Sequence, residues 1–357
     1  MSGVKYVVIG GGILGLTSAM HLLKDDDVAR VILVEKTAPL AGISGQAGAG
    51  DLPIFWSERH RDLIERSWSH HLGRSSSDGR TRHPVAWNGF DADESISVWG
   101  GTVPMSQAPS DLSAPLRRDV NPDVLPQITA SWAYRISPLA HGASLLRDLR
   151  RDPRFTEIIG EAADTIPTRG GVLVRLDDGS DIQADGVIVA VGPWITAADN
   201  SWASAARALG LRTKRVFGLR AQVEPGRRGT SAFADAEQAI FILPTTRRDE
   251  IAMSIRHAEW DVDAGPGDLP REVRDKGVDA VRRLTTWGGL SDIRPRVHVD
   301  TYTPDSTPHV VAAGNQRVVL ITATHGSGIR LAPALAEDAV ALLRKASVVP
   351  ETAGRAQ

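Results

Sequence analysis

The chain of 357 residues carries 41 Lys and Arg against 43 Asp and Glu, and its formal net charge of −2 does not indicate a nucleic-acid partner. Its length suggests two domains, and the absence of cysteine excludes disulfides, thiol catalysis and thiolate metal sites. No apolar run approaches the roughly 18 residues of a membrane span, and the first predicted strand begins by Val4, too early for a signal peptide. We therefore expect a cytoplasmic protein with no membrane partner and no metal.

The apolar run Lys5–Ile9 of the first predicted strand leads into a G-x-G-x-x-G pattern and then a helix. In such a unit Gly10 makes the tight turn, Gly12 lets backbone N–H groups approach a pyrophosphate, and Gly15 lets the helix lie close to the sheet. Glu35 ends the next strand, twenty residues after Gly15, where it can accept hydrogen bonds from ribose hydroxyls. The glycine pattern alone is weak evidence, but the complete unit of strand, glycine turn, helix, strand and acid predicts a dinucleotide-binding site.

The middle of the chain shows less regular patterns. Apolar residues at helical spacing predict a helix within 53–73, and the polar stretch 74–82 is expected to be a loop. Residues 85–105 favour a hairpin because turn sequences flank β-like stretches. Five prolines between Pro104 and Pro126 argue against long regular elements there.

The second half of the chain alternates between the hydrophobic period of a helix and that of a strand. We predict further helices at 138–149 and 271–284, a hairpin formed by 172–176 and 182–191, and short strands at 218–223, 240–243 and 251–255. Near the end, a buried strand from Val318 leads into the turn His325-Gly-Ser-Gly328 and an amphipathic helix. A simple NAD unit does not require this second glycine element.

These segments together resemble the D-amino-acid-oxidase-like FAD family, which includes glycine oxidase and monomeric sarcosine oxidase. Besides the two glycine turns, the run Asp185–Trp194 is similar to a family strand that ends in a glycine, and Thr303-Pro304-Asp305 resembles the family's T-P-D segment. The resemblance implies a two-domain α/β (α+β) fold, in which a Rossmann-like FAD-binding domain is interleaved with an antiparallel-sheet substrate domain. The FAD-binding domain is expected to comprise residues 1–84, 135–214 and 297–357, and the substrate domain 85–134 and 215–296.

The resemblance also implies FAD as the cofactor and a set of residues around it. These are Gly10, Gly12, Ile13, Leu14, Gly15, Glu35, Lys36, Ser44, Gly45, Gln46, Ala163, Gly192, Trp194, His325, Gly326, Gly328, Ile329 and Arg330.

The activity implied is oxidation of a C–N bond in an amine or amino acid to an imine. Electrons would pass to dioxygen, giving hydrogen peroxide, or to another acceptor. In such enzymes the cofactor supplies the chemistry and the protein supplies orientation and electrostatics. The alternatives are an FAD-dependent 2-hydroxy acid dehydrogenase, a flavoprotein subunit that works only in a hetero-complex, and an NAD-dependent reductase.

Four residues are candidates for the substrate side, again by resemblance. His257 follows a strand that in sarcosine oxidase ends in an active-site histidine, but it could equally be a surface residue in a polar turn. Arg330 stands where that pattern has a carboxylate-binding lysine, and it could hold a carboxylate bidentately or instead point at solvent or at the flavin phosphate.

His298 stands where sarcosine-oxidase-like members carry the cysteine bonded to the flavin, so a cysteinyl linkage is impossible here. The histidine could form its own bond to the flavin ring, but we expect it to lie free beside the ring. Asp300 replaces the arginine with which glycine-oxidase-like members bind the substrate carboxylate, which puts a simple amino-acid substrate in doubt. Met253 replaces the lysine that activates oxygen, which puts rapid reaction with dioxygen in doubt. Aromatic residues that could wall a pocket, or lie in the core instead, are Trp132, Tyr134, Trp260 and Trp287.

Overall fold

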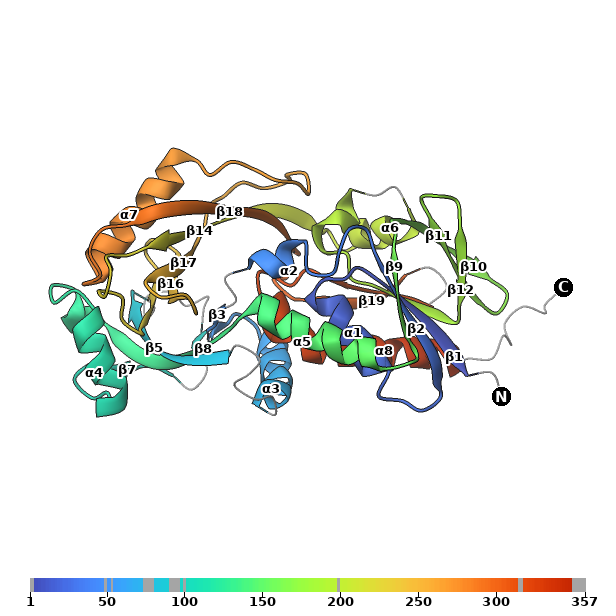
Figure 1. Cartoon of the computed structure of the whole chain (residues 1–357), viewed down its shortest axis with the longest axis horizontal. Coiled ribbons are helices and arrows are strands. Elements are labelled where there is room, and N and C mark those ends of the chain that lie inside the picture. The colour runs from blue at the N-terminus through green and yellow to red at the C-terminus, as the bar shows by residue number, and fades with distance from the viewer. Residues whose placement is uncertain are drawn as a thin grey trace.

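A computed structural model describes residues 3–47, 50–52, 54–72, 80–89, 97–98, 101–197, 200–313 and 317–348. Figure 1 shows an elongated molecule with a parallel sheet around β1 at one end and an antiparallel sheet around β14 and β18 at the other. In the part of the chain that is described, no helix is both long and apolar enough to cross a membrane. The mixed α/β fold predicted from the sequence is confirmed.

The parallel sheet has six strands in the order β19-β20-β13-β1-β2-β9, and only β19 runs antiparallel to its neighbour. Its strands are β1 (Val4–Ile9), β2 (Val28–Glu35), β9 (Phe155–Ile159), β13 (Gly186–Val189), β19 (His309–Ala313) and β20 (Val318–Thr322). The central strands β13 and β20 are buried along their whole length, as continuous apolar runs covered on both faces should be.

Alternate residues of β1 enter two different cores. Val8 packs in a cluster with residues of three helices, α1 (Ile13–Leu22), α5 (Pro138–Arg151) and α8 (Gly328–Val348). Val7 packs on the opposite face of the sheet. That face is covered by α6 (Ser201–Ala208) and by the sheet of β10 (Ala162–Thr168), β11 (Gly171–Leu176) and β12 (Asp181–Ala184).

The second large sheet has the strand order β18-β14-β17-β16-β15-β5-β8-β3, with β7 also paired to β8. All its pairs are antiparallel except β15 with β5. The strands are β3 (Gly50–Asp51), β5 (Arg80–Asn88), β7 (Val103–Pro104), β8 (Thr129–Ile136), β14 (Arg212–Gln222), β15 (Ala232–Asp235), β16 (Ile240–Pro244), β17 (Glu250–Ile255) and β18 (Ser291–Tyr302).

Helices cover one face of this sheet. α4 (Ser110–Asp119) and α7 (Arg271–Leu284) bury their apolar side chains in a cluster with Phe217 and Leu219 of β14. The remaining elements within the described residues are α2 (Ile43–Gln46), α3 (Glu58–Leu72), β4 (Ile54–Phe55), β6 (Ser97–Val98) and the short 3-10 helices η3 (Leu125–Gln127) and η4 (Gly192–Thr196). The helices predicted within 53–73 and at 138–149 and 271–284 are confirmed.

Two sequence predictions are wrong. Residues 104–126 contain the ten-residue helix α4, with Pro115 inside it. The proline removes one helical hydrogen bond, but Leu112 and Leu116, four residues apart, are buried in the core and offset that loss. The hairpin expected within 85–105 does not form among the described residues, because β6 pairs with β4 while β5 pairs with β8 and β15. Most of the expected loop 74–82 lies outside the described residues, and β5 begins at Arg80.

The division of the chain into two domains stays a prediction. The four boundaries expected after residues 84, 134, 214 and 296 fall inside β5, β8, β14 and β18. These are all strands of the antiparallel sheet, so the strand ends are the natural places to draw the boundaries.

The substitution Leu116→Ala tests the packing of α4. Leu116 is fully buried, so the truncation should leave a cavity and lower the free energy of unfolding by about 2–5 kcal/mol. Leu139 of α5 is 54% exposed, and Leu139→Ala should change stability by only about 0.5 kcal/mol. Denaturant unfolding measures both, and equal effects would show that α4 does not pack as described.

Candidate cofactor and substrate site

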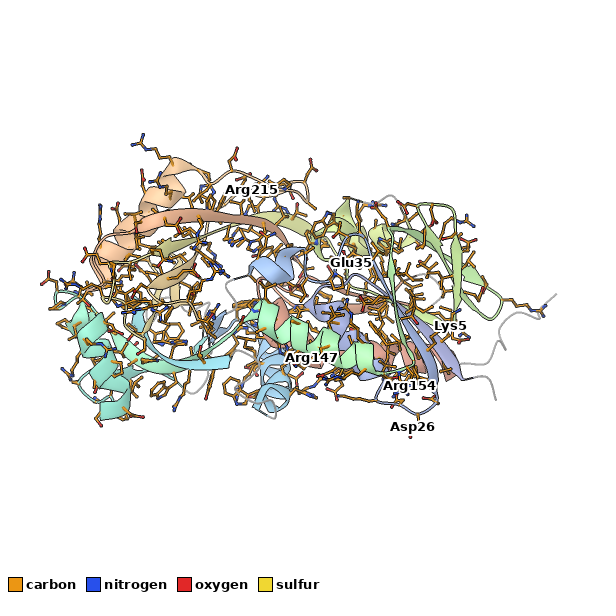
Figure 2. All side chains as sticks on the ribbon, viewed as in Figure 1. Lys5, Asp26, Glu35, Arg147, Arg154 and Arg215 are labelled. Atoms are coloured by element: carbon orange, nitrogen blue, oxygen red, sulfur yellow. The ribbon has the colours of Figure 1, made fainter. Side chains whose placement is uncertain are left out.

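One cavity of about 1010 Å³ is lined by residues of both large sheets. Its volume lies at the upper end of the roughly 300–1,000 Å³ typical of ligand pockets, so it can hold a large cofactor and a small substrate. Glu35 and Arg215 both line it, and Figure 2 shows them over different parts of the molecule, Glu35 by the parallel sheet and Arg215 by β14 and β18. The cavity therefore extends from one sheet to the other.

The first glycine turn is built for a close backbone approach. Gly10 has φ +103°, and a β-carbon on it would lie 2.5 Å from the carbonyl oxygen of Ala190. A β-carbon on Gly15 would overlap the carbonyl oxygen of Gly10, so this glycine lets α1 pack against β1. Gly12 caps α1 without a side-chain hydrogen bond, and the next N–H, of Ile13, donates to Ser44 Oγ at 3.0 Å. The Ile13 N–H is therefore occupied, but the N–H groups of Gly12 and Leu14 have no acceptor among the described residues, and the N-terminus of α1 can present them to an anion at the cavity wall.

Glu35 closes this end of the cavity. Its Oε2 accepts a hydrogen bond from the N–H of Gly11 at 2.6 Å, and Oε1 accepts one from the N–H of Thr37 at 3.1 Å. These contacts fix the carboxylate beside the glycine turn, where it can accept further hydrogen bonds from hydroxyl groups. Lys36 forms an ion pair with Glu161 at 2.7 Å, and both residues also line the cavity.

Most of the residues expected around FAD line this cavity. They are Gly10, Gly12, Ile13, Leu14, Glu35, Lys36, Ser44, Gln46, Gly192, Trp194, His325, Gly326, Gly328, Ile329 and Arg330. The structure places Gly15 and Gly45 against backbone carbonyl oxygens instead. It places Ala163 at the exposed surface, whereas Ala162 lines the cavity.

The other wall is one face of the antiparallel sheet. Side chains alternate along a strand, so residues opposite Phe217 and Leu219 on β14 turn away from the core. The cavity-facing set on β14, β17, β16 and β18 includes Lys214, Val216, Gly218, Arg220, Ala252, Ser254, Phe241, Leu243, Arg296, His298 and Asp300. The sequence thus builds an apolar core on one face and a polar wall on the other.

Asp300 and His298 lie two residues apart on this wall. Asp300 Oδ2 accepts a hydrogen bond from the N–H of Gly326 at 2.5 Å, which ties β18 to the C-terminal glycine turn. Burial raises the pKa of Asp300 above its usual value, although the N–H groups of Thr301 and Gly326 oppose the shift. Burial lowers the pKa of His298 to about 4, so its ring is neutral near pH 7. The wall presents a carboxyl group beside a neutral base.

His325 and His257 flank this pair. Burial lowers the pKa of His325 to about 4, and its Nε2 accepts a hydrogen bond from the N–H of Thr303 at 3.3 Å. His257 packs edge-on against Phe217 at 5.3 Å between ring centroids. Of the four aromatic residues proposed as pocket walls, only Trp260 lines the cavity, where its ring lies 4.8 Å from Lys214 Nζ.

Arg330 is buried and engaged by the protein itself. Its guanidinium donates to the carbonyl oxygens of Leu52 at 2.5 Å and Ile54 at 3.0 Å, and to Ser327 Oγ at 3.0 Å. Nη2 also lies 3.2 Å from Nε2 of His60, whose pKa burial and Arg330 lower to about 2. These contacts give Arg330 a structural task at the cavity wall, and its binding of a substrate carboxylate stays a prediction.

The sequence analysis missed five basic residues that line the cavity, which are Lys214, Arg215, Arg220, Arg256 and Arg296. The signal for Arg296 was present, because polar residues alternate with apolar ones from Ile293 to Asp300. Such alternation predicts a half-buried strand, but it does not tell whether the polar face meets solvent or a ligand.

The fold and this cavity define a class of dinucleotide-dependent oxidoreductases, in which a parallel sheet binds the cofactor and an antiparallel sheet covers it. A family model described as "FAD dependent oxidoreductase" matches residues 5–342. The chain belongs to this family, and FAD is its cofactor. The glycine turns, the N-terminus of α1 and Glu35 form a cradle that fits the pyrophosphate and ribose of FAD.

Solved structures share the fold at low sequence identity. An L-proline dehydrogenase from P. horikoshii is 18% identical with a TM-score of 0.76, over 96% of this chain and 94% of that one. A glycine oxidase from Geobacillus kaustophilus is 14% identical with a TM-score of 0.72, over 98% and 96%. An iminodiacetate oxidase from Chelativorans sp. BNC1 is 15% identical with a TM-score of 0.68, over 97% of each chain. No protein in the curated set matches the sequence significantly.

The substitution Glu35→Ala tests the cofactor cradle. Removing the carboxylate leaves the Gly11 N–H and the ribose hydroxyls without an acceptor, so FAD binding should weaken by about 1–3 kcal/mol. Titration of the apoprotein with FAD measures the change. Asp178→Ala, in the exposed turn between β11 and β12, should leave FAD affinity unchanged. An unchanged affinity in Glu35→Ala would remove Glu35 from the site.

The flavin should dissociate when the protein is denatured, because the chain has no cysteine to bond it. Acid precipitation should leave the yellow colour in the supernatant, and the released cofactor should be FAD rather than FMN. Colour retained by the precipitate would contradict this expectation, and its loss in His298→Ala would identify the linkage.

Proposed function

We propose that the protein oxidises the C–N bond of an amine or amino acid to an imine, with electrons passing to dioxygen or another acceptor. Bound FAD would supply the redox chemistry by accepting a hydride equivalent, two electrons and one proton, from the substrate carbon. The observation that carries the proposal is the position of Asp300 and the neutral His298 on the same face of β18 at the cavity wall, beside the C-terminal glycine turn.

An amine must be bound and deprotonated before it is oxidised. It arrives as an ammonium ion, which a carboxylate attracts, and it must lose a proton before its carbon can give up a hydride. Asp300 suits the first task because it is held toward the cavity by Gly326. His298 suits the second because burial keeps its ring unprotonated and able to accept a proton. His257 is a further candidate for this proton transfer.

Anaerobic bleaching of the bound flavin across amines, amino acids and 2-hydroxy acids tests the proposal. Amines or amino acids should bleach the flavin, and hydroxy acids should not. Bleaching by hydroxy acids alone would assign the protein as a hydroxy acid dehydrogenase. No bleaching by any of these compounds, with FAD bound, would favour a subunit that works only in a complex. Reoxidation of the bleached protein with dioxygen or with a dye then identifies the acceptor.

The substitution Asp300→Asn tests the binding of the ammonium ion. Loss of the negative charge should weaken binding of a cationic amine roughly 10- to 100-fold, as expected for a hydrogen bond to a charged group. Because burial raises the pKa of Asp300, wild-type affinity should be present above that pKa and fall as pH drops through it. The variant should lack this decline. Asp305→Asn, outside the cavity lining, is the matched control and should behave as wild type.

A further inference from the structure

The cavity has a cationic end that the oxidation itself does not require. Arg220 of β14 and Arg296 of β18 both line it. Arg296 is opposite Gly218 in the register, so Arg220 is its diagonal neighbour on the same face of the sheet. Diagonal neighbours are about 7–8 Å apart, within reach of long side chains. No side chain at Gly218 stands between them.

Arg296 has no counter-ion in the part of the chain that the structure describes. It makes no hydrogen bond or ion pair with any residue that the structure describes, and its Nε is enclosed without a partner. Its two terminal nitrogens are not enclosed in this way, so they stay accessible at the cavity wall. A guanidinium carries five N–H donors, and the four on the terminal nitrogens of Arg296 are free for a ligand.

Arg220 is only partly neutralised. Its nearest carboxylate is that of Glu250, with Nη1 and Oε1 3.5 Å apart. Glu250 is fully buried and pairs more closely with Arg294 at 2.5 Å, while Arg247 lies 3.8 Å away. One carboxylate therefore serves three guanidinium groups, of which only Arg294 has a second acidic partner among the described residues, Asp292 at 3.3 Å.

Arg135 of β8 adds to the excess of positive charge. It is 3% exposed, and its Nε and Nη1 have no partner among the described residues. Burial and the nearby Arg220 lower its pKa to about 10, so it remains a cation near pH 7. A buried charge is stable only when it is paired, and Glu250 cannot pair with all of these groups.

The other charged groups on this wall do not neutralise the cluster. Asp300 stands four residues beyond Arg296 on β18, about 13 Å along the strand, and its carboxylate is bound to the Gly326 N–H. Asp235 lines the cavity but pairs with Arg283. Lys214 and Arg256 add positive charge.

We propose that Arg220 and Arg296 form a subsite for an anionic group of the substrate, a carboxylate, remote from the amine that is oxidised. The inference rests on the proposed function, because Asp300 and His298 mark the amine end of the same strand. The substrate class is then an amine or amino acid with an additional acidic group, lying along β18 from Asp300 to Arg296. Two guanidinium groups can hold a carboxylate by charge-assisted, bidentate hydrogen bonds.

Binding of non-oxidisable probes tests the subsite without catalysis. Glutarate should perturb the absorbance spectrum of the bound flavin in the holoenzyme, and glutaramide should bind at least about tenfold more weakly because it has no charge. Arg220→Gln and Arg296→Gln should each weaken glutarate binding about tenfold or more, and Arg296→Lys should restore part of the loss. Phosphate that binds tighter than glutarate through the same arginines would keep the subsite and assign it a phosphoryl group.

Arg271→Gln is the matched control, because it removes the same charge from an exposed position on α7, where the Arg271 side chain is 91% exposed. It should bind glutarate as wild type does. Equal affinity for glutarate and glutaramide, or glutarate binding that survives both arginine substitutions, would overturn the proposal. Circular dichroism and FAD content establish that each variant is folded.

Kinetics separate this inference from the proposed function. 5-Aminopentanoate and pentylamine carry the same amine with and without a carboxylate. Arg296→Gln should raise the apparent Kd for the acidic amine about tenfold and change that for pentylamine less than twofold. Equal losses for both amines would overturn the subsite. Arginine-dependent glutarate binding without bleaching by any amine would instead sink the proposed function and leave the subsite standing.

Discussion

The two-residue alternation of side chains along β14 and β18 is the constraint on which this site depends. One face of these strands carries Phe217 and Leu219 into the core, and the other lines the cavity with Arg220, Arg296 and His298. The two faces are therefore free to differ, and the cavity wall can be charged while the core stays apolar. A slip of one residue would exchange the faces and bury the charges, so the core packing also fixes the register of the site.

The parallel sheet imposes a second constraint, on the cofactor. β1, β13 and β20 run in the same direction, so their carboxyl ends meet at one edge. The glycine turns that follow these three strands are far apart in the sequence but line the same cavity. Asp300 connects the two sheets, because it accepts a hydrogen bond from the Gly326 N–H and so links the antiparallel wall to the turn after β20. This hydrogen bond thus fixes the position of the antiparallel wall relative to the edge of the parallel sheet.

A feature of this fold was predictable from the sequence when the residues that determine it lie close together in the chain. The turn at Gly10 and the acid at Glu35 were predictable, because their chemistry is met within one strand-turn-helix-strand unit. The helix α4 was not, because the burial that offsets Pro115 comes from contacts with distant strands. The partners of Arg330 were not predictable either, since Leu52 and Ile54 reach it across more than 270 residues. The cationic end of the cavity was not predictable, because Arg220 and Arg296 become neighbours only when β14 pairs with β18.

The arrangement of charge along β18 is what a ligand of mixed charge requires. A carboxyl group at Asp300 and a guanidinium at Arg296 orient such a ligand in one direction only, because the reverse direction would place like charges together. Glu250 pairs with Arg294 and approaches Arg220 on the same face of the sheet, and it is not among the residues that line the cavity, so it holds these two arginines without occupying the cavity. Pre-positioned donors lose little conformational freedom when the ligand binds. The single negative charge of Glu250 does not neutralise all the cations around it, and the remaining positive charge favours binding of an anion.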